Sequence, residues 1–391
     1  MEENILLILT LSVVIWGSPF IAKVLRIPTP PIEIVLGSLF AYIGFIEHNE
    51  YFSLIAKVGF LYLMFLAGME VNLKQIANSS KIVLRKSIFF LAAMVFFSMG
   101  AGYLFGLEPI IVISMPLISI GLLASLSKNY GKDQPWIRMA FIVGVLGEIA
   151  SIALLTVFDA ASKTGVNITL FSHLGYLVLF MVTIYFIYRF LHLIFWWYPE
   201  LKSVLMPKFD TSDQDIRLSI ALFFILIAVM LSLELELALG AFIAGVAISA
   251  FFHHEKKLEE KMSSLGFGFL VPLFFIHVGS SFDLDALIVP GVVKGALLIT
   301  VLMILARVLA ASTLRALNGS KNALLIGLSL SMPLTLLIAV ATIGYEAHLL
   351  EKMYYYQLIL ASIFEILISM IIIKLLVSSK KSKAEKDSME G

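Results

Sequence analysis

The tetrapeptide Ser-Met-Pro-Leu occupies residues 114–117, and the same four residues return at 331–334, 217 positions later. The same offset carries Glu148-Ile149 onto Glu365-Ile366. One four-residue match arises easily by chance in a leucine-rich sequence, but two matches in one register are harder to dismiss. The sequence therefore predicts that the chain is built from two related halves.

The composition is that of a membrane protein. Apolar residues make up 60% of the 391 positions and charged residues only 14%, with a mean hydropathy of +0.99. Soluble domains carry about 25% charged and about 45–50% apolar residues, so a soluble protein is excluded. The net charge of +1 gives no electrostatic reason to expect nucleic-acid binding. The sequence has no cysteine, which excludes disulfide scaffolds and thiolate metal sites.

Thirteen stretches are candidate transmembrane helices, because a bilayer core needs about 20 apolar residues per helix. They cover roughly residues 4–23, 30–47, 53–71, 86–106, 109–127, 136–158, 166–196, 216–233, 237–252, 264–281, 289–313, 322–343 and 354–376. The runs are continuously apolar rather than alternating, so the predicted fold class is an all-α polytopic membrane protein. The polar stretch at 197–215 is interpreted as a linker between the halves.

The basic residues predict an orientation. Thirteen spans place the two termini on opposite sides and divide the loop lysines and arginines 23 to 3. Cytoplasmic loops carry the excess of basic residues in membrane proteins. We therefore expect a plasma (inner) membrane protein with its N-terminus outside and residues 378–391 as a short cytoplasmic tail.

The repeated elements lie in spans five and twelve and in spans six and thirteen, seven spans apart. An odd separation inverts the second copy, and inverted-topology repeats are typical of secondary transporters with a binding site near the bilayer midplane. Pro116 and Pro333 each remove a backbone donor and interrupt a helix. We expect these two breaks, with the neighbouring hydroxyls of Ser114, Ser119, Ser331 and Thr335, to form an ion site. The alternative is a pair of kinks that bind nothing.

Three charges lie well inside predicted spans, where each is costly and marks a candidate functional site. Glu148 is interpreted as the group that binds either a proton or a metal cation, since a carboxylate is a hard oxygen ligand. Arg307 is interpreted as its fixed counter-charge. Glu365 either pairs with Arg307 or is the counterpart of Glu148 in the second half. A static ion pair between Glu148 and Arg307 is the structural alternative.

Small residues flank Glu148 on its predicted helix. Ala140, Gly144, Gly147 and Ser151 follow spacings of 4, 3 and 4 and share one face. Such a face lets a neighbouring backbone approach closely. We therefore expect Glu148 to point into the helix bundle.

Several motifs occur in the order found in one transporter family. They are Arg26-Ile27-Pro28 followed by Glu33–Gly37, then Gly59–Glu70, Leu239–Gly245, and Pro272–Phe275 followed by Val278-Gly279. With these motifs the chain resembles the bacterial monovalent cation:proton antiporters of the Kef and sodium–proton exchanger type over about residues 1–377.

The resemblance implies a fold with two crossed broken helices. A core domain, about 86–158 and 289–376, would lie beside a dimerisation panel, about 4–71 and 166–281, and would move against it like an elevator in a homodimer. Glu148 falls where the family keeps its ion-binding acid. Ser119 and Arg307 fall where relatives carry a Ser or Thr and a Lys or Arg.

The predicted function is antiport of Na⁺ or K⁺ against protons, with no cofactor and no enzymatic activity. Many relatives have Asn-Asp, Asp-Asp or Gln-Asp where this chain has Gly147-Glu148, so a one-for-one exchange is favoured. Glu365 keeps an electrogenic exchange open. A sodium-coupled symporter of an organic anion is the alternative, with Arg307 as the anion's partner.

Overall fold

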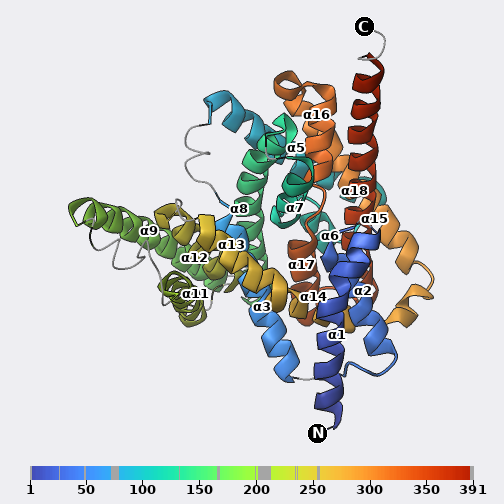
Figure 1. Ribbon diagram of the computed structural model, residues 1–391, viewed down its shortest axis with the longest axis horizontal. Coiled ribbons are helices and arrows are strands. Elements are labelled where there is room, and N and C mark those ends of the chain that lie inside the picture. The colour runs from blue at the N-terminus through green and yellow to red at the C-terminus, as the bar shows by residue number, and fades with distance from the viewer. Residues whose placement is uncertain are drawn as a thin grey trace. The chain divides into compact units, whose positions relative to one another are not determined.

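A computed structural model describes residues 2–25, 27–47, 50–71, 79–131, 133–164, 168–198, 200, 213–233, 235, 237–252 and 256–387. The described residues form α-helices with short 3₁₀ and π segments, and no strand occurs among them (Figure 1). Most of the expected linker at 197–215 lies outside the described residues, as does Arg26 of the family motif.

The chain divides into two compact units. Unit 1 comprises Met1–Glu47, Lys74–Ser151 and Val278–Gly391, and unit 2 comprises His48–Leu73 and Ile152–His277. The assignment of particular spans to a moving core and a dimerisation panel stays a prediction.

Unit 1 holds most of the helices. They are α1 (Glu2–Leu25), α2 (Thr29–Tyr42), α5 (Lys81–Phe105), α6 (Pro109–Ser114), α7 (Gly121–Tyr130), the first part of α8 (Pro135–Thr164), η2 (Leu284–Leu287), α15 (Val292–Ala310), η3 (Ala311–Leu314), α16 (Arg315–Ser329), α17 (Leu334–Glu346) and α18 (Lys352–Asp387). Unit 2 holds the rest of α8 with α3 (Glu50–Met69), α9 (Ile168–Trp197), α11 (Gln214–Ser232), α12 (Leu237–Phe252), α13 (Lys256–Leu265), the π segment η1 (Gly266–Leu270) and most of α14 (Val271–Ser280).

Each of the thirteen expected spans falls on one helix or on a run of helical pieces. Within the described ranges, eight helical stretches are long and apolar enough to cross a membrane. Shorter apolar helices, among them α12 and α17, fill other expected spans. The fold class is therefore confirmed, and the count of thirteen crossings stays a prediction.

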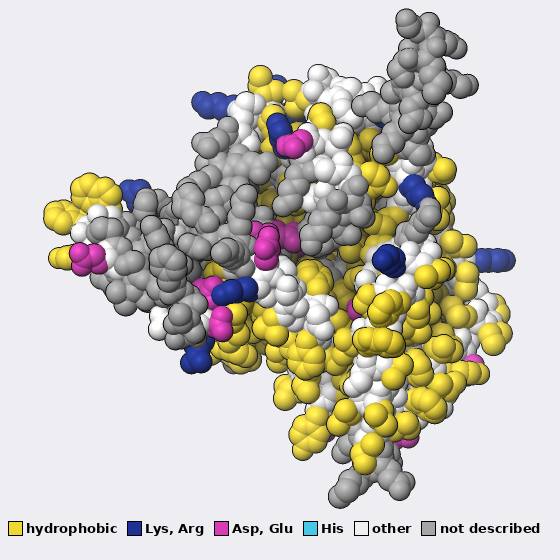
Figure 2. Space-filling model, viewed as in Figure 1, with side chains coloured by type: hydrophobic (Ala, Val, Ile, Leu, Met, Phe, Trp, Pro, Cys, Tyr) yellow, Lys and Arg dark blue, Asp and Glu magenta, His cyan; other side chains and the backbone are white. Residues whose placement is uncertain are grey.

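Apolar side chains cover the outside of these helices as well as their buried faces. Along α1 the exposed apolar positions include Ile5, Ile8, Leu9, Val13, Trp16 and Phe20, and Figure 2 shows hydrophobic side chains over this face of unit 1. An apolar patch of this extent is unusual on a soluble monomer. It is the surface expected of helices that contact lipid.

Two of the expected spans are broken in the structure. The span predicted at 109–127 consists of α6 and α7 separated by non-helical residues 115–120. The span predicted at 322–343 consists of α16 and α17, with residues 330–333 between them. α6 packs against α17, so the two interrupted helices lie side by side within unit 1. The 217-residue offset also relates the first residues of α8 and α18, Pro135 and Lys352.

Close packing in unit 2 depends on glycine. A Cβ atom added at Gly245 of α12 would lie 2.0 Å from the carbonyl oxygen of Phe65. One added at Gly68 of α3 would lie 2.1 Å from the carbonyl oxygen of Phe242. The backbones of α3 and α12 thus approach more closely than any larger residue allows.

Gly245→Ala is expected to destabilise the protein. Its Cβ meets backbone rather than a movable side chain, and overpacking of this kind costs about 1–3 kcal/mol. A fall in the melting temperature of the detergent-solubilised protein would show it. Gly17→Ala on α1 is the matched control, because nothing lies within 4 Å of a Cβ at that position. Equal melting temperatures for the two variants would contradict the close approach.

Candidate ion-binding site

Three backbone groups of the non-helical residues 115–120 find their hydrogen-bond partners in side chains of other helices, whereas others bond to backbone nearby in the chain. The Ile118 N–H donates to Ser151 Oγ at 2.8 Å, and the Ile120 N–H donates to Glu148 Oε2 at 3.0 Å. The carbonyl oxygen of Leu117 accepts from Arg307 Nη2 at 2.7 Å. Backbone groups that leave a helix must be satisfied in this way where water is absent. The break is therefore held by α8 on one side and α15 on the other.

Two glycines on α8 make room for the break. A Cβ at Gly147 would lie 2.4 Å from Ile118 Cδ1, and a Cβ at Gly144 would lie 2.7 Å from Ile120 Cγ2. The face expected to be small is therefore the face against which the non-helical segment 115–120 packs. Because Glu148 and Ser151 border this face, both side chains reach backbone N–H groups of the break.

The carboxyl group of Glu148 is fully buried and only half engaged. Oε2 accepts the bond from Ile120, whereas Oε1 has no hydrogen-bond partner among the described residues. The Ser119 hydroxyl also interacts with this carboxyl group. Ser119 Oγ lies 3.3 Å from Thr335 Oγ1, so a hydroxyl from each half of the repeat reaches the same place. Carboxylate and hydroxyl oxygens are the type of ligand that a hard cation prefers.

Arg307 and Glu365 form a fully buried ion pair. Arg307 Nη1 lies 2.6 Å from Glu365 Oε1, and neither side chain is exposed. Arg307 Nη1 also donates to the carbonyl oxygen of Met303 at 3.1 Å. The structure thus pairs Arg307 with the acid of the second half, and not with Glu148. Arg307 Nε and Glu365 Oε2 have no hydrogen-bond partner within the described part of the chain.

The remaining residues singled out by the sequence have local roles in the breaks. Ser114 Oγ donates to the carbonyl oxygen of Ile111 at 2.7 Å, and Ser331 Oγ donates to that of Gly327 at 2.9 Å. Both hydroxyls therefore complete the last turn before a break rather than face Glu148. Pro116 lies inside the first break, and Pro333 directly precedes α17.

The hydrogen bonds made by two buried polar side chains, Ser151 and Glu33, were not predicted from the sequence. Ser151 was chosen only for its small size, but its hydroxyl accepts the Ile118 N–H. Glu33 on α2, identified from the sequence only as part of a family motif, is only 3% exposed and accepts from Ser18 Oγ at 3.2 Å. The signal for Glu33 was an acid within an apolar stretch, Pro31–Leu36. Sequence spacing alone does not say which way that acid points.

Comparison with known proteins agrees with this fold. Residues 8–379 match the family described as "Sodium/hydrogen exchanger, transmembrane". The chain is 24% identical to YjbQ of Bacillus subtilis over 93% of this chain, and it spans 61% of the length of YjbQ. It is 23% identical to the Na(+)/H(+)-K(+) antiporter GerN of Bacillus cereus, covering 91% of this chain and 90% of GerN.

A solved structure shares the architecture. The sodium proton antiporter MjNhaP1 from Methanocaldococcus jannaschii superposes with a TM-score of 0.67 at 16% identity, covering 96% of this chain and 99% of that one. At this identity the likeness shows the fold alone.

The buried ion pair predicts a strong energetic coupling. Glu365→Leu strands the guanidinium of Arg307, and Arg307→Met strands the carboxylate, each of which should cost about 3–5 kcal/mol. The double variant should lose much less than the sum, because no unpaired charge remains. Melting temperatures of the four proteins in detergent measure the coupling.

The exposed ion pair Arg138–Asp133 is the control for this double-mutant comparison. Its atoms lie 3.8 Å apart and both side chains are largely exposed, so the corresponding coupling should be about 0–1 kcal/mol. Additive losses for Arg307→Met and Glu365→Leu would show that the buried pair is not coupled.

Proposed function

Because the chain belongs to the sodium/hydrogen exchanger family, we propose that it is a membrane antiporter that exchanges Na⁺ or K⁺ for protons at Glu148. The match over residues 8–379 supports antiport of a monovalent cation. The name of GerN supports K⁺ as a second possible cation beside Na⁺. Ion and proton are transported substrates, so this function needs no resident cofactor.

The observation that carries the proposal is the half-engaged carboxyl group of Glu148. Its Oε1 atom is buried without a hydrogen-bond partner in the described structure. The Ser119 hydroxyl adjoins the carboxyl group and lies 3.3 Å from Thr335 Oγ1. A buried carboxylate oxygen in this state is costly unless it takes up a proton or a cation. Either ligand neutralises the same oxygen, so binding one excludes the other. That competition is the physical basis of exchange.

The pairing of Arg307 with Glu365 supports a one-for-one exchange. Their charges compensate each other within a contact of 2.6 Å. Of the two acids predicted to lie at the site, Glu148 and Glu365, only Glu148 is then left without a cationic partner. A single carboxyl group can alternate between one proton and one monovalent cation. We therefore propose an electroneutral cycle, in which Arg307 positions the break by donating to Leu117 and does not bind the ion.

The remaining parts of the proposal follow the family. We propose that a core domain containing α5–α8 and α15–α18 moves like an elevator against a dimerisation panel in a homodimer. We also propose that the protein lies in the plasma (inner) membrane. Its N-terminus then lies outside the cell, and residues 378–391 lie in the cytoplasm. The 23 to 3 division of basic residues supports this orientation.

The alternative was a sodium-coupled symporter of an organic anion with Arg307 as the anion's partner. Arg307 is fully buried, and its two terminal nitrogens already donate to Glu365, Met303 and Leu117. An anion would have to displace Glu365 to reach the guanidinium group. The antiporter is therefore favoured.

Glu148→Gln should abolish exchange. The amide keeps the size of the side chain but cannot alternate between a proton and a cation. Proteoliposomes loaded with a pH-sensitive dye report proton movement on addition of Na⁺ and then K⁺. Glu346→Gln is the matched control, because Glu346 is exposed at the end of α17. Full exchange by a folded Glu148→Gln protein would contradict the proposal.

Ser119→Ala should weaken cation binding and leave proton binding in place. The hydroxyl adjoins the carboxyl group of Glu148 and is a candidate ligand for the ion. Loss of one such ligand corresponds to about a 3- to 15-fold rise in the cation concentration for half-maximal exchange. Ser114→Ala, whose hydroxyl bonds its own helix, is the control. An equal rise in both variants would argue against Ser119 as a ligand.

A further inference from the structure

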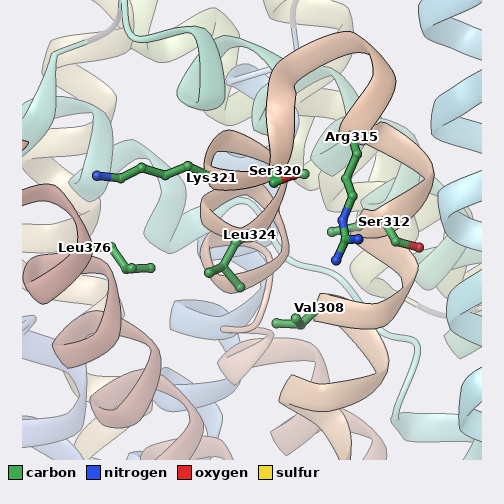
Figure 3. Close-up of a pocket in the computed structure, with 9 residues that line it drawn as sticks. Val308, Ser312, Arg315, Ser320, Lys321, Leu324 and Leu376 are labelled. Atoms are coloured by element: carbon green, nitrogen blue, oxygen red, sulfur yellow. The ribbon is translucent and has the colours of Figure 1, made fainter.

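A cavity of about 330 Å³ lies in unit 1, away from Glu148. It is formed by the end of α15, the 3₁₀ turn η3, the first turns of α16 and the late part of α18 (Figure 3). In Figure 1 this part of α16 lies at the same end of unit 1 as the C-terminal end of α18. The cavity plays no part in the exchange chemistry proposed for Glu148.

Two cations line the cavity. Figure 3 shows the guanidinium group of Arg315 beside Ser312, while Lys321 starts on the opposite side of the cavity and its amine extends away from Arg315. Gly319 has a φ of 75° and kinks the chain between the two bases. No ion pair with an acid involves either base within the described part of the chain. The cavity therefore offers uncompensated positive charge, with hydroxyls at Ser312 and Ser320, to an anion.

The rest of the lining is apolar. Val308, Ala311, Leu324 and Leu376 form the wall beneath the two bases. A free inorganic anion gains nothing from such a wall. A phospholipid presents a phosphate directly joined to a glycerol and acyl chains, so it satisfies the bases and the apolar wall together. Basic pockets between the ends of transmembrane helices are typical sites for acidic headgroups.

The surrounding charge favours the same ligand. Lys374 is exposed on α18, two residues before Leu376. The sequence beyond it adds Lys380, Lys381, Lys383 and Lys386. These bases belong to the predicted cytoplasmic side, where the membrane leaflet carries anionic lipids. Each base near that surface adds to the attraction for an acidic headgroup.

We propose that this cavity is a binding site for the phosphate headgroup of an anionic phospholipid, held by Arg315 and Lys321 with its glycerol end against Val308 and Leu376. The inference does not depend on the proposed exchange at Glu148. A lipid bound there would tie α15, α16 and α18 together at one end of unit 1. It would therefore stabilise the fold whether or not transport occurs.

Titration of a short-chain lipid into the detergent-solubilised protein tests this site. Dioctanoyl phosphatidylglycerol should raise the melting temperature in a saturable way, and dioctanoyl phosphatidylcholine should not. In the double variant Arg315→Gln/Lys321→Gln, the midpoint concentration should rise about fivefold for each base removed. Lys294→Gln near the other end of α15 and Lys81→Gln at the start of α5 are controls with the same loss of charge.

Each contrary result has a definite meaning. An equal response to phosphatidylcholine, or an unchanged midpoint in the double variant, would overturn the site. The same stabilisation by inorganic phosphate alone would overturn the lipid as its occupant. If the double variant does not fold, Ser312→Asp places a negative charge at the cavity without removing a base. Native mass spectrometry of Ser312→Asp should then show loss of the bound phosphatidylglycerol that the wild type retains.

Discussion

A backbone that leaves its helix in a place without water must exchange every lost helical hydrogen bond for another partner. Residues 115–120 meet this requirement partly with local backbone bonds and partly with side chains from distant parts of the chain. Ser151 and Glu148 accept two of the N–H groups, and Arg307 donates to one carbonyl oxygen. The packing of α8 and α15 around the break, and hence the site itself, depends on these three contacts.

The same requirement links the structure to the proposed exchange. Glu148 uses Oε2 to hold the Ile120 N–H, so the carboxyl group is fixed in place while Oε1 stays available. Gly144 and Gly147 let α8 come close enough for this bond. If Arg307 paired with Glu148, that static pair would compete with both ions of the proposed exchange. The contact of Arg307 with Glu365 removes that competition.

The sequence predicted those features that depend on residue type and spacing. The Ser-Met-Pro-Leu repeat located both breaks, because proline cannot continue a helix bond and the offset of 217 aligned the two copies. Helical periodicity predicted that the small residues of α8 lie on one face of that helix. The acid that pairs with Arg307 could not be predicted from the sequence, because Glu148 and Glu365 are both acids within apolar helices. The choice between them depends on the direction in which α18 points Glu365. The burial of Glu33 was not readable for a similar reason, because its contact with Ser18 depends on how α1 packs against α2.

The most direct test of a shared carboxyl group is to count protons during cation binding at equilibrium. Na⁺, and then K⁺, is titrated calorimetrically into the purified protein in two buffers that differ in ionisation enthalpy. Near the pH at which Glu148 is half protonated, the heat should depend on the buffer, because an entering cation expels a proton. Glu148→Gln should lose both this dependence and the cation binding. Cation binding to Glu148→Gln with unchanged affinity and proton release would contradict the account.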